Sequence, residues 1–318
     1  MQVLYGRMYF EDATCQNDLI PYTTDNNESV LATTDGRVEF LKRNGEVMAL
    51  VKSPPDYPIY YPVRSTPFSG SARGILMDLD GTTILSEEFW VGAIEETVGL
   101  LLNDPGFKFT PDDLPHVVGY STREHLQYCI GKYKIETTIK KALKMNSVVS
   151  EARLSQLEQN EGSSLLKASP GLKEFLIALK DHGIKIGLVT AASERKALIE
   201  IRSVFRELDL GDPLDFYDTI ITAGNSGGKF KVSTLGSLAS KPHPWLYAEA
   251  ARVGLGLGEE EREHIIGIED SAAGVISLKL AGFAAIGMKE GNITSSGVRP
   301  LLHAECEYLP DLLPLLIK

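Results

Sequence analysis

The stretch that most constrains the fold of this chain runs from Gly74 to Leu85 and reads Gly-Ile-Leu-Met-Asp-Leu-Asp-Gly-Thr-Thr-Ile-Leu. A short apolar run bounded by a glycine is typical of a buried strand in a parallel sheet. Asp78 and Asp80 would then lie at the carboxyl end of that strand, where open α/β sheets place their ligands. Two carboxylates in one crevice repel each other unless a cation lies between them. An ion that prefers oxygen ligands, such as Mg²⁺, would meet that need.

Composition and charge exclude several classes of protein. The chain has 318 residues, of which 43% are apolar, so it can bury the core of two domains or of one domain with an insertion. Its net charge of −11 argues against nucleic acid as the main partner, since phosphate backbones bind clustered Lys and Arg. No apolar run approaches the roughly 20 residues of a membrane span, and we expect no membrane partner.

The cysteines and the first residues bear on the compartment. The three cysteines lie far apart and form no metal-ligand or redox spacing, and the first residues do not resemble a signal peptide. We therefore expect a protein of the reducing cytoplasm. The oligomeric state stays open, with a monomer favoured.

Residues 1–52 differ in pattern from the rest and predict a small β-rich appendage at the N-terminus. An Asn44-Gly45 pair lies between apolar flanks, which is a strong hairpin signal because both residues tolerate positive φ. A role in packing or partner binding is favoured over a catalytic one. Residues 53–73 carry five prolines, which predicts a stiff, extended linker.

The remainder divides into a helical segment and an α/β core. Residues 86–167 show helical periodicity and almost no strand-like run, which predicts an inserted helical cap. Residues 168–318 return to alternating strands and helices and, with 74–85, would form the parallel-sheet core. Between the later elements, residues 224–240 form a polar glycine- and serine-rich loop whose role the sequence leaves open.

Further polar residues follow the core strands. Thr190 follows the apolar run 184–189, Glu269 and Asp270 follow the run 264–268, and Lys241 precedes a helix that begins near Trp245. Each has an ordinary structural alternative: a threonine caps helices, a lone lysine is normally solvated, and acids favour helix N-termini. Because parallel strands end at one edge of a sheet, we expect Thr190, Glu269 and Asp270 near Asp78.

Four of these segments resemble the sequence motifs of the haloacid dehalogenase superfamily. They are Asp-Leu-Asp-Gly-Thr at 78–82, Thr-Ala-Ala-Ser at 190–193, Lys-Pro-His-Pro at 241–244 and Ile-Glu-Asp-Ser-Ala-Ala-Gly at 268–274. The helical segment directly after the first strand resembles the α-helical cap of the β-phosphoglucomutase-like branch. The resemblance implies a Rossmann-like α/β core with an inserted helical cap, and it covers about Gly74 to Met288.

The resemblance also implies a role for each motif residue. Asp78 would be the nucleophile, Asp80 the general acid and base, and Lys241 the cation that neutralises the phosphoryl group. The Thr190 hydroxyl and the Ala191 amide would hold phosphoryl oxygens. The Mg²⁺ ligands would be four acids: Asp78, Asp80, Glu269 and Asp270.

The cap residues 119–126 resemble the loop that this branch uses for its substrate. Gly119 and Arg123 would then bind the substrate, with Arg123 suited to a second phosphate because its fork matches that geometry. It is equally consistent with the sequence that Arg123 is an exposed surface residue without a binding role.

Within the superfamily, the second aspartate favours phosphoryl transfer over dehalogenation, because a halide leaving group needs no proton. We therefore expect a Mg²⁺-dependent phosphatase of a small sugar or polyol phosphate that works through an aspartyl-phosphate. A β-phosphoglucomutase-like phosphomutase is the alternative, and a non-catalytic binding protein with this fold is a third possibility.

Overall fold

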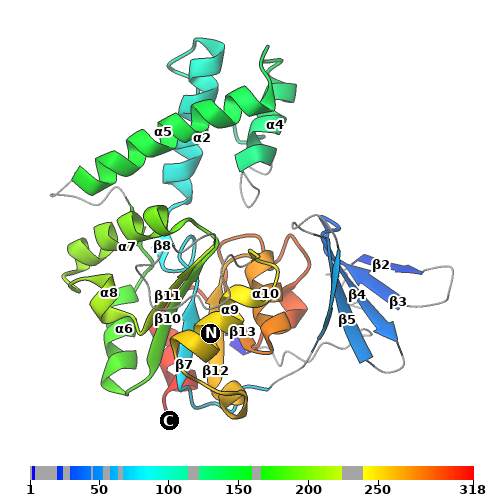
Figure 1. Cartoon of the computed structure of the whole chain (residues 1–318), viewed down its shortest axis with the longest axis vertical. Coiled ribbons are helices and arrows are strands. Elements are labelled where there is room, and N and C mark those ends of the chain that lie inside the picture. Colours follow the sequence, from blue (N-terminus) through cyan, green and yellow to red (C-terminus); the bar gives the residue numbers. More distant parts are fainter. Residues whose placement is uncertain are drawn as a thin grey trace.

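The computed structural model describes residues 2–3, 20–23, 29–43, 46–52, 58–63, 67–113, 122–159, 166–223 and 239–318. Figure 1 shows three parts: an α/β core, a group of helices above it, and an antiparallel sheet at its side. In the described part of the chain, no helix is both long and apolar enough to cross a membrane. The predicted loop at 224–240 lies mostly outside the described residues.

The core is built on a sheet with the strand order β1-β14-β13-β12-β7-β10-β11. All neighbouring strands pair in parallel except the edge strand β1. β7 lies inside the sheet between β12 and β10, and all four of its residues are buried. This confirms the predicted fold class. The strands are β1 (Gln2–Val3), β7 (Gly74–Met77), β10 (Lys185–Thr190), β11 (Thr219–Thr222), β12 (Ile265–Glu269), β13 (Ala284–Met288) and β14 (Ala304–Cys306).

Helices cover both faces of this sheet, as its continuous apolar strands require. The side chains of Ile75 and Met77 on β7 belong to a buried apolar cluster on one face of the sheet. This cluster also contains residues of α6 (Leu172–Asp181) and α7 (Glu194–Leu208). Leu76 belongs to a second buried apolar cluster on the opposite face, which contains residues of α9 (Trp245–Glu249) and α10 (Ala272–Ala281). The shorter elements are α8 (Pro213–Phe216), η1 (Ala250–Gly254), η2 (Glu259–His264), η3 (Arg299–Leu301), η4 (Leu309–Leu312) and α11 (Leu313–Leu316).

The helical cap consists of α2 (Glu87–Leu102), α4 (Thr122–Lys132) and α5 (Ile139–Gln159). It has an apolar cluster of its own that includes Val98, Leu126 and Cys129. The chain leaves the core through β8 (Ile84–Leu85) and returns through β9 (Lys167–Ala168), and these two strands pair with each other. The cap is thus joined to the core by a short two-stranded connection (Figure 1).

The N-terminal appendage is an antiparallel sheet with the order β2-β3-β4-β5-β6. The register of β4 and β5 pairs Arg43 with Glu46, as the predicted hairpin requires, while the turn residues 44 and 45 lie outside the described part. One prediction is corrected: β6 falls within residues 53–73, which we expected to be a linker, and it pairs with β5. The strands are β2 (Ile20–Thr23), β3 (Ser29–Ala32), β4 (Val38–Arg43), β5 (Glu46–Val51) and β6 (Ile59–Pro62).

The appendage packs on the core with one face. Leu31, Phe40 and Tyr61 are buried in the same cluster as residues of α9 and α10. The Tyr61 hydroxyl also lies 2.8 Å from Nδ1 of the buried His243, just before α9. This sheet therefore contributes to the core that supports α9.

We expect Phe40→Ala to lower the free energy of unfolding of the whole protein by about 3 kcal/mol, because it leaves a cavity between the appendage and the core. Urea denaturation followed by fluorescence would measure the change. The control is Tyr60→Ala on β6, a side chain that is 57% exposed, which should change stability by less than about 0.5 kcal/mol. Equal, small effects of the two variants would show that the appendage does not stabilise the core.

Candidate active site

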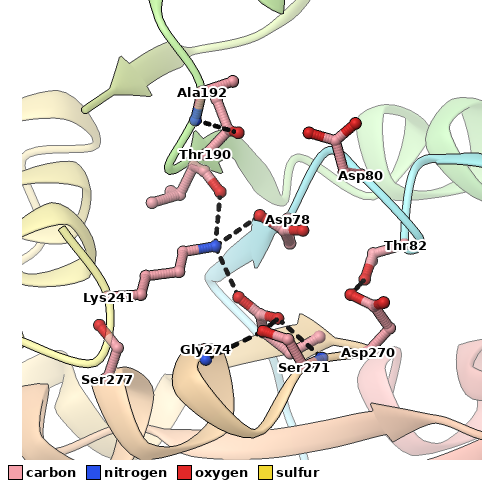
Figure 2. Close-up of polar contacts among 12 residues, drawn as sticks. Asp78, Asp80, Thr82, Thr190, Ala192, Lys241, Asp270, Ser271, Gly274 and Ser277 are labelled. Carbon is pink, nitrogen blue, oxygen red and sulfur yellow. Dashed lines mark hydrogen bonds and ion pairs between the residues drawn. The ribbon is translucent and has the colours of Figure 1, made fainter. Parts of the chain in front are cut away.

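The carboxyl ends of the central strands bring the predicted motif residues to one place. Met77 on β7 is in register with Ile268 on β12 and with Leu188 on β10. The residues that follow, Asp78, Glu269 and Val189, therefore lie side by side at the sheet edge. Lys241 reaches this edge from the segment before α9, as Figure 2 shows.

The Lys241 ammonium is the centre of the polar contacts. It donates to Asp78 Oδ1 at 2.5 Å, to Glu269 Oε1 at 2.6 Å and to the Val189 carbonyl at 3.1 Å. An ammonium has three hydrogens to donate, so all are used. The lysine side chain is only 5% exposed. Burial alone would lower the pKa of Lys241, but Asp78 and Glu269 outweigh that effect and raise it.

Three acids at this edge form a candidate metal centre. Asp78, Glu269 and Asp270 each offer a carboxylate oxygen, and these oxygens lie within 4.8 Å of one another. Burial, only partly offset by Lys241, raises the pKa of Asp78 to about 7, and burial with the neighbouring acids raises the pKa of Asp270 well above its ordinary value. A buried group of oxygen donors with more negative than positive charge suits a hard divalent cation such as Mg²⁺.

Two hydroxyl groups that we did not predict hold Glu269. The Tyr247 hydroxyl on α9 donates to Oε1 at 2.5 Å, and the Ser271 hydroxyl donates to Oε2 at 2.9 Å. Ser271 also accepts from the Gly274 amide at 3.1 Å as the N-cap of α10. The N-cap was readable from the sequence, because a serine precedes the helix. The role of Tyr247 was not, because it depends on where α9 packs.

Gly81 allows the chain to turn beside Asp270. Its φ is +80°, and a Cβ at this position would lie 2.1 Å from Asp270 Oδ2. The next two hydroxyls fix the same turn: Thr82 donates to Asp270 Oδ1 at 3.4 Å and Thr83 to the Asp78 carbonyl at 2.5 Å. The Asp-Gly-Thr-Thr order thus shapes the loop that follows the first strand.

Thr190 and Ala191 lie at the end of β10 and line the same cavity as Asp78. The Thr190 side chain is almost fully buried, and its hydroxyl accepts from the Ala192 amide at 3.0 Å. The strand end thus places Thr190 and Ala191 at the same cavity as the nucleophile predicted from the sequence.

The Asp80 carboxylate lies apart from the group around Lys241, as Figure 2 shows, and is outside the acidic cluster. It contacts Lys196 on α7 through both oxygens, at 2.9 and 2.8 Å, and accepts from the Ser86 hydroxyl. That its side chain is a metal ligand therefore stays a prediction, whereas its contact with Lys196 is an addition that we did not foresee.

Glu200 is a buried acid that the motifs did not point to. It lies one turn after Lys196, 3.0 Å from that ammonium, and accepts from Nε1 of Trp90 on α2 at 2.6 Å. Burial raises the pKa of Glu200 to about 7, with Asp80 adding to the effect. The i, i+4 spacing of Lys196 and Glu200 was visible in the sequence, but it is also common on exposed helices.

A cavity of about 840 Å³ opens above these groups, between the core and the cap. The charged side chains of Asp78, Asp80, Lys196, Lys241 and Asp270 line its core side. The polar residues on its cap side are mostly neutral, with two acids among them, Glu87 and Glu151; the neutral ones are Thr122, His125, Asn146, Ser147 and Ser150. Burial lowers the pKa of His125 to about 4, so its imidazole is neutral near pH 7.

The two predicted substrate-binding residues of the cap have different outcomes. Arg123 is exposed on α4 and does not line this cavity, whereas its neighbours Thr122 and His125 do. Gly119 lies outside the described residues.

Comparisons with known proteins agree with this geometry. The family model of the haloacid dehalogenase-like hydrolases matches residues 72–282, which is more than half of the chain. A curated relative from Thermotoga maritima, a phosphorylated carbohydrates phosphatase, is 25% identical over 217 residues, covering 67% of this chain and 83% of the relative.

Two solved structures share the fold. CbbY from Rhodobacter sphaeroides, solved with xylulose-(1,5)bisphosphate, has a TM-score of 0.55 at 18% identity and covers 78% of this chain and all of its own. The β-phosphoglucomutase of Clostridium difficile has a TM-score of 0.51 at 21% identity and covers 76% of this chain and 93% of its own. The sheet, the inserted cap and the family match lead to one conclusion: this chain belongs to the haloacid dehalogenase-like hydrolases, and it is a phosphohydrolase.

Proposed function

We propose that this protein is a Mg²⁺-dependent phosphatase that hydrolyses a small sugar or polyol phosphate through an aspartyl-phosphate on Asp78. The observation that carries the proposal is the environment of Asp78. Its Oδ1 is held by the Lys241 ammonium, and it lines the cavity together with Asp270, while the fully buried Glu269 completes the acidic cluster. A carboxylate fixed between a cation and a candidate metal centre is suited to attack an incoming phosphoryl group.

In the first step, an Asp78 oxygen bonds to phosphorus while the bond to the substrate's leaving oxygen breaks. Asp80 gives its proton to that leaving oxygen. Lys241 neutralises the charge that accumulates on the equatorial oxygens of the phosphoryl group, and the Thr190 hydroxyl donates a hydrogen bond to one of them. Bound Mg²⁺, held by Asp78, Glu269 and Asp270, would supply further positive charge to the same oxygens.

In the second step, Asp80 takes a proton from water as the water oxygen attacks phosphorus. The bond between phosphorus and Asp78 then breaks, which releases inorganic phosphate and returns the carboxylate. The same residue therefore acts as an acid and then as a base, as the reversed direction of the two proton transfers requires.

The substrate class rests on the cap side of the cavity. Hydroxyl, amide and neutral imidazole groups there can exchange hydrogen bonds with the hydroxyls of a sugar or polyol. The Thermotoga maritima relative, which is named for phosphorylated carbohydrates, supports the same class.

We expect Asp78→Asn to lower the hydrolysis of p-nitrophenyl phosphate by at least about 10³-fold, because the amide is a poor nucleophile. Release of p-nitrophenolate measures the rate. The control is Asp112→Asn on the exposed surface of the cap, which should keep the wild-type rate. A variant of Asp78 with more than about a tenth of the wild-type activity would rule out the aspartyl-phosphate. Conversion of β-glucose 1-phosphate to another sugar phosphate without free phosphate would indicate the phosphomutase instead.

Removal of divalent ions should abolish hydrolysis, and Mg²⁺ should restore it. Asp270→Asn should raise the Mg²⁺ concentration needed for half-maximal activity by about 10-fold or more, since it removes one of three candidate ligands. Titration calorimetry with Mg²⁺ alone gives a readout that does not depend on turnover. Equal Mg²⁺ affinities of the variant and the wild type would contradict this assignment of the metal site.

Asp78 should contribute a loss of stability of the metal-free protein as the pH rises from about 4 to about 7. The pKa of Asp78 rises from 3.8 in the unfolded chain to about 7 in the folded one, so in this window the folded state holds a proton that the unfolded state has lost. Binding more protons in the folded state makes the free energy of unfolding decrease with pH. Denaturant titrations across this window would measure the decrease.

Asp78→Asn should make that decrease smaller, because it removes one of the groups that titrate. Saturating Mg²⁺ should also reduce it, since a cation favours the ionised carboxylates. A wild-type slope that neither Mg²⁺ nor the substitution changes would assign the titration to other groups.

A further inference from the structure

A second charged cluster lies at the edge of the cavity and is separate from the group around Lys241. Lys196 Nζ contacts Asp80 at 2.8 Å and Glu200 at 3.0 Å, so one ammonium bridges two acids. The Glu200 side chain is fully buried, while Lys196 is 22% exposed. Burying a carboxylate costs free energy unless charges and hydrogen bonds compensate it.

We propose that Lys196 and Glu200 are positioning residues that hold the Asp80 carboxylate in place and couple it to cap helix α2. The proposal rests on the proposed function, in which Asp80 carries the proton. Lys196 does not touch the reacting atoms in this arrangement. It acts through Asp80.

Contacts with the cap make this cluster a link between the two parts of the molecule. Glu200 accepts from Nε1 of Trp90 on α2, and the Lys196 ammonium lies 4.9 Å from the centre of the Trp90 ring. Ser86, which directly precedes α2, donates to Asp80 Oδ1. Ser86 of the cap side and Lys196 of the core thus hold the Asp80 carboxylate directly, while Trp90 and Glu200 hold Lys196.

Each partner restrains a different freedom of Asp80. Lys196 contacts both of its oxygens, which fixes the plane of the carboxylate, and Ser86 adds a second donor to Oδ1. Glu200 lies 3.0 Å from the same ammonium and restrains the lysine, because an ammonium on a long, flexible side chain needs a second partner to keep one geometry. Without Glu200, we expect Lys196 to be poorly ordered and Asp80 to lose its fixed orientation.

Orientation matters because proton transfer requires the donor and acceptor to be within hydrogen-bond reach. A displacement of about 1 Å can cost about 10²-fold in rate. The cost should depend on the substrate. A poor leaving group needs the proton of Asp80 as the bond to phosphorus breaks, whereas a good leaving group such as p-nitrophenolate departs with little help.

The test compares kcat/KM for phenyl phosphate and p-nitrophenyl phosphate, in Mg²⁺, for the wild type and Lys196→Met. We expect the variant to lose at least about 10-fold more on phenyl phosphate than on p-nitrophenyl phosphate. Asp80→Asn should show the same preference more strongly. Lys196→Arg, which keeps the charge and can contact both oxygens, should recover most of the activity on phenyl phosphate.

Two further variants test the coupling to the cap. Glu200→Gln keeps the acceptor for Trp90 but removes the charge, and Trp90→Phe removes the N–H donor. Both should shift the ratio of the two substrates in the same direction as Lys196→Met, by a smaller factor. They also keep the proposal testable if Lys196→Met does not fold.

The matched control is Lys180→Met, which removes another partly buried, ion-paired lysine of the core, at Asp218 and outside the cavity. It should leave the ratio unchanged. Equal losses on both substrates in the Lys196 and Glu200 variants would overturn the proposal, because a general loss of stability affects both alike.

Asp78→Asn, measured beside these variants, separates this inference from the proposed function. If it abolishes both activities while the Lys196 variants lower both equally, only the positioning role fails. If it leaves them intact, the proposed function fails first.

Discussion

The buried ammonium of Lys241 is the interaction on which the arrangement of the site depends. It is held by Asp78, Glu269 and a strand carbonyl, and these groups come from three neighbouring strands. Three acids gathered in a buried place would repel one another, and this single cation compensates only part of their charge. Burial is the main cause of the raised pKa of Asp78 and Asp270, and the neighbouring acids add to it. The excess of negative charge among these acids favours a divalent cation at this place.

The cavity divides the chemical work between the core and the cap. The core supplies both lysines and three aspartates to the cavity, whereas the cap contributes mostly neutral donors and acceptors beside Glu87 and Glu151. Groups that must be fixed to a fraction of an ångström are thus set by the sheet, and groups that contact the variable part of a substrate lie on the inserted helices. Asp80 is the exception, because its carboxylate is held from both sides, by Lys196 of the core and by Ser86 at the start of the cap.

The N-terminal sheet is tied to both of these parts. It shares an apolar cluster with α9, the helix that carries Tyr247 to Glu269, and Tyr61 contacts His243 just before that helix. Arg37, in the turn between β3 and β4, also forms an ion pair with Glu124 on cap helix α4. An element that lies outside the family match therefore packs against the segment that carries Tyr247 to the site.

The sequence by itself determined the fold class and the set of groups at the strand ends. Apolar runs that end in Asp78, Thr190 and Glu269 specify strands and their direction, and parallel strands must present their ends at one edge. A local signal for the N-cap at Ser271 was also present, although we did not predict it, since capping is a local interaction. Only the tertiary structure decided which groups surround these residues. Tyr247, Lys196, Glu200 and Trp90 come from helices whose packing brings them to the acids, and helical spacing alone does not reveal such contacts.

Two further differences have the same cause. The predicted linker contains β6, because a strand of four residues acquires its identity from its partner β5 and not from its own proline-rich sequence. Arg123 was chosen by motif, but the orientation of α4 places its neighbours Thr122 and His125 at the cavity instead. Local patterns fix what each segment can form. The contacts between distant segments decide which side chains meet, because those contacts depend on burial and charge compensation across the whole fold.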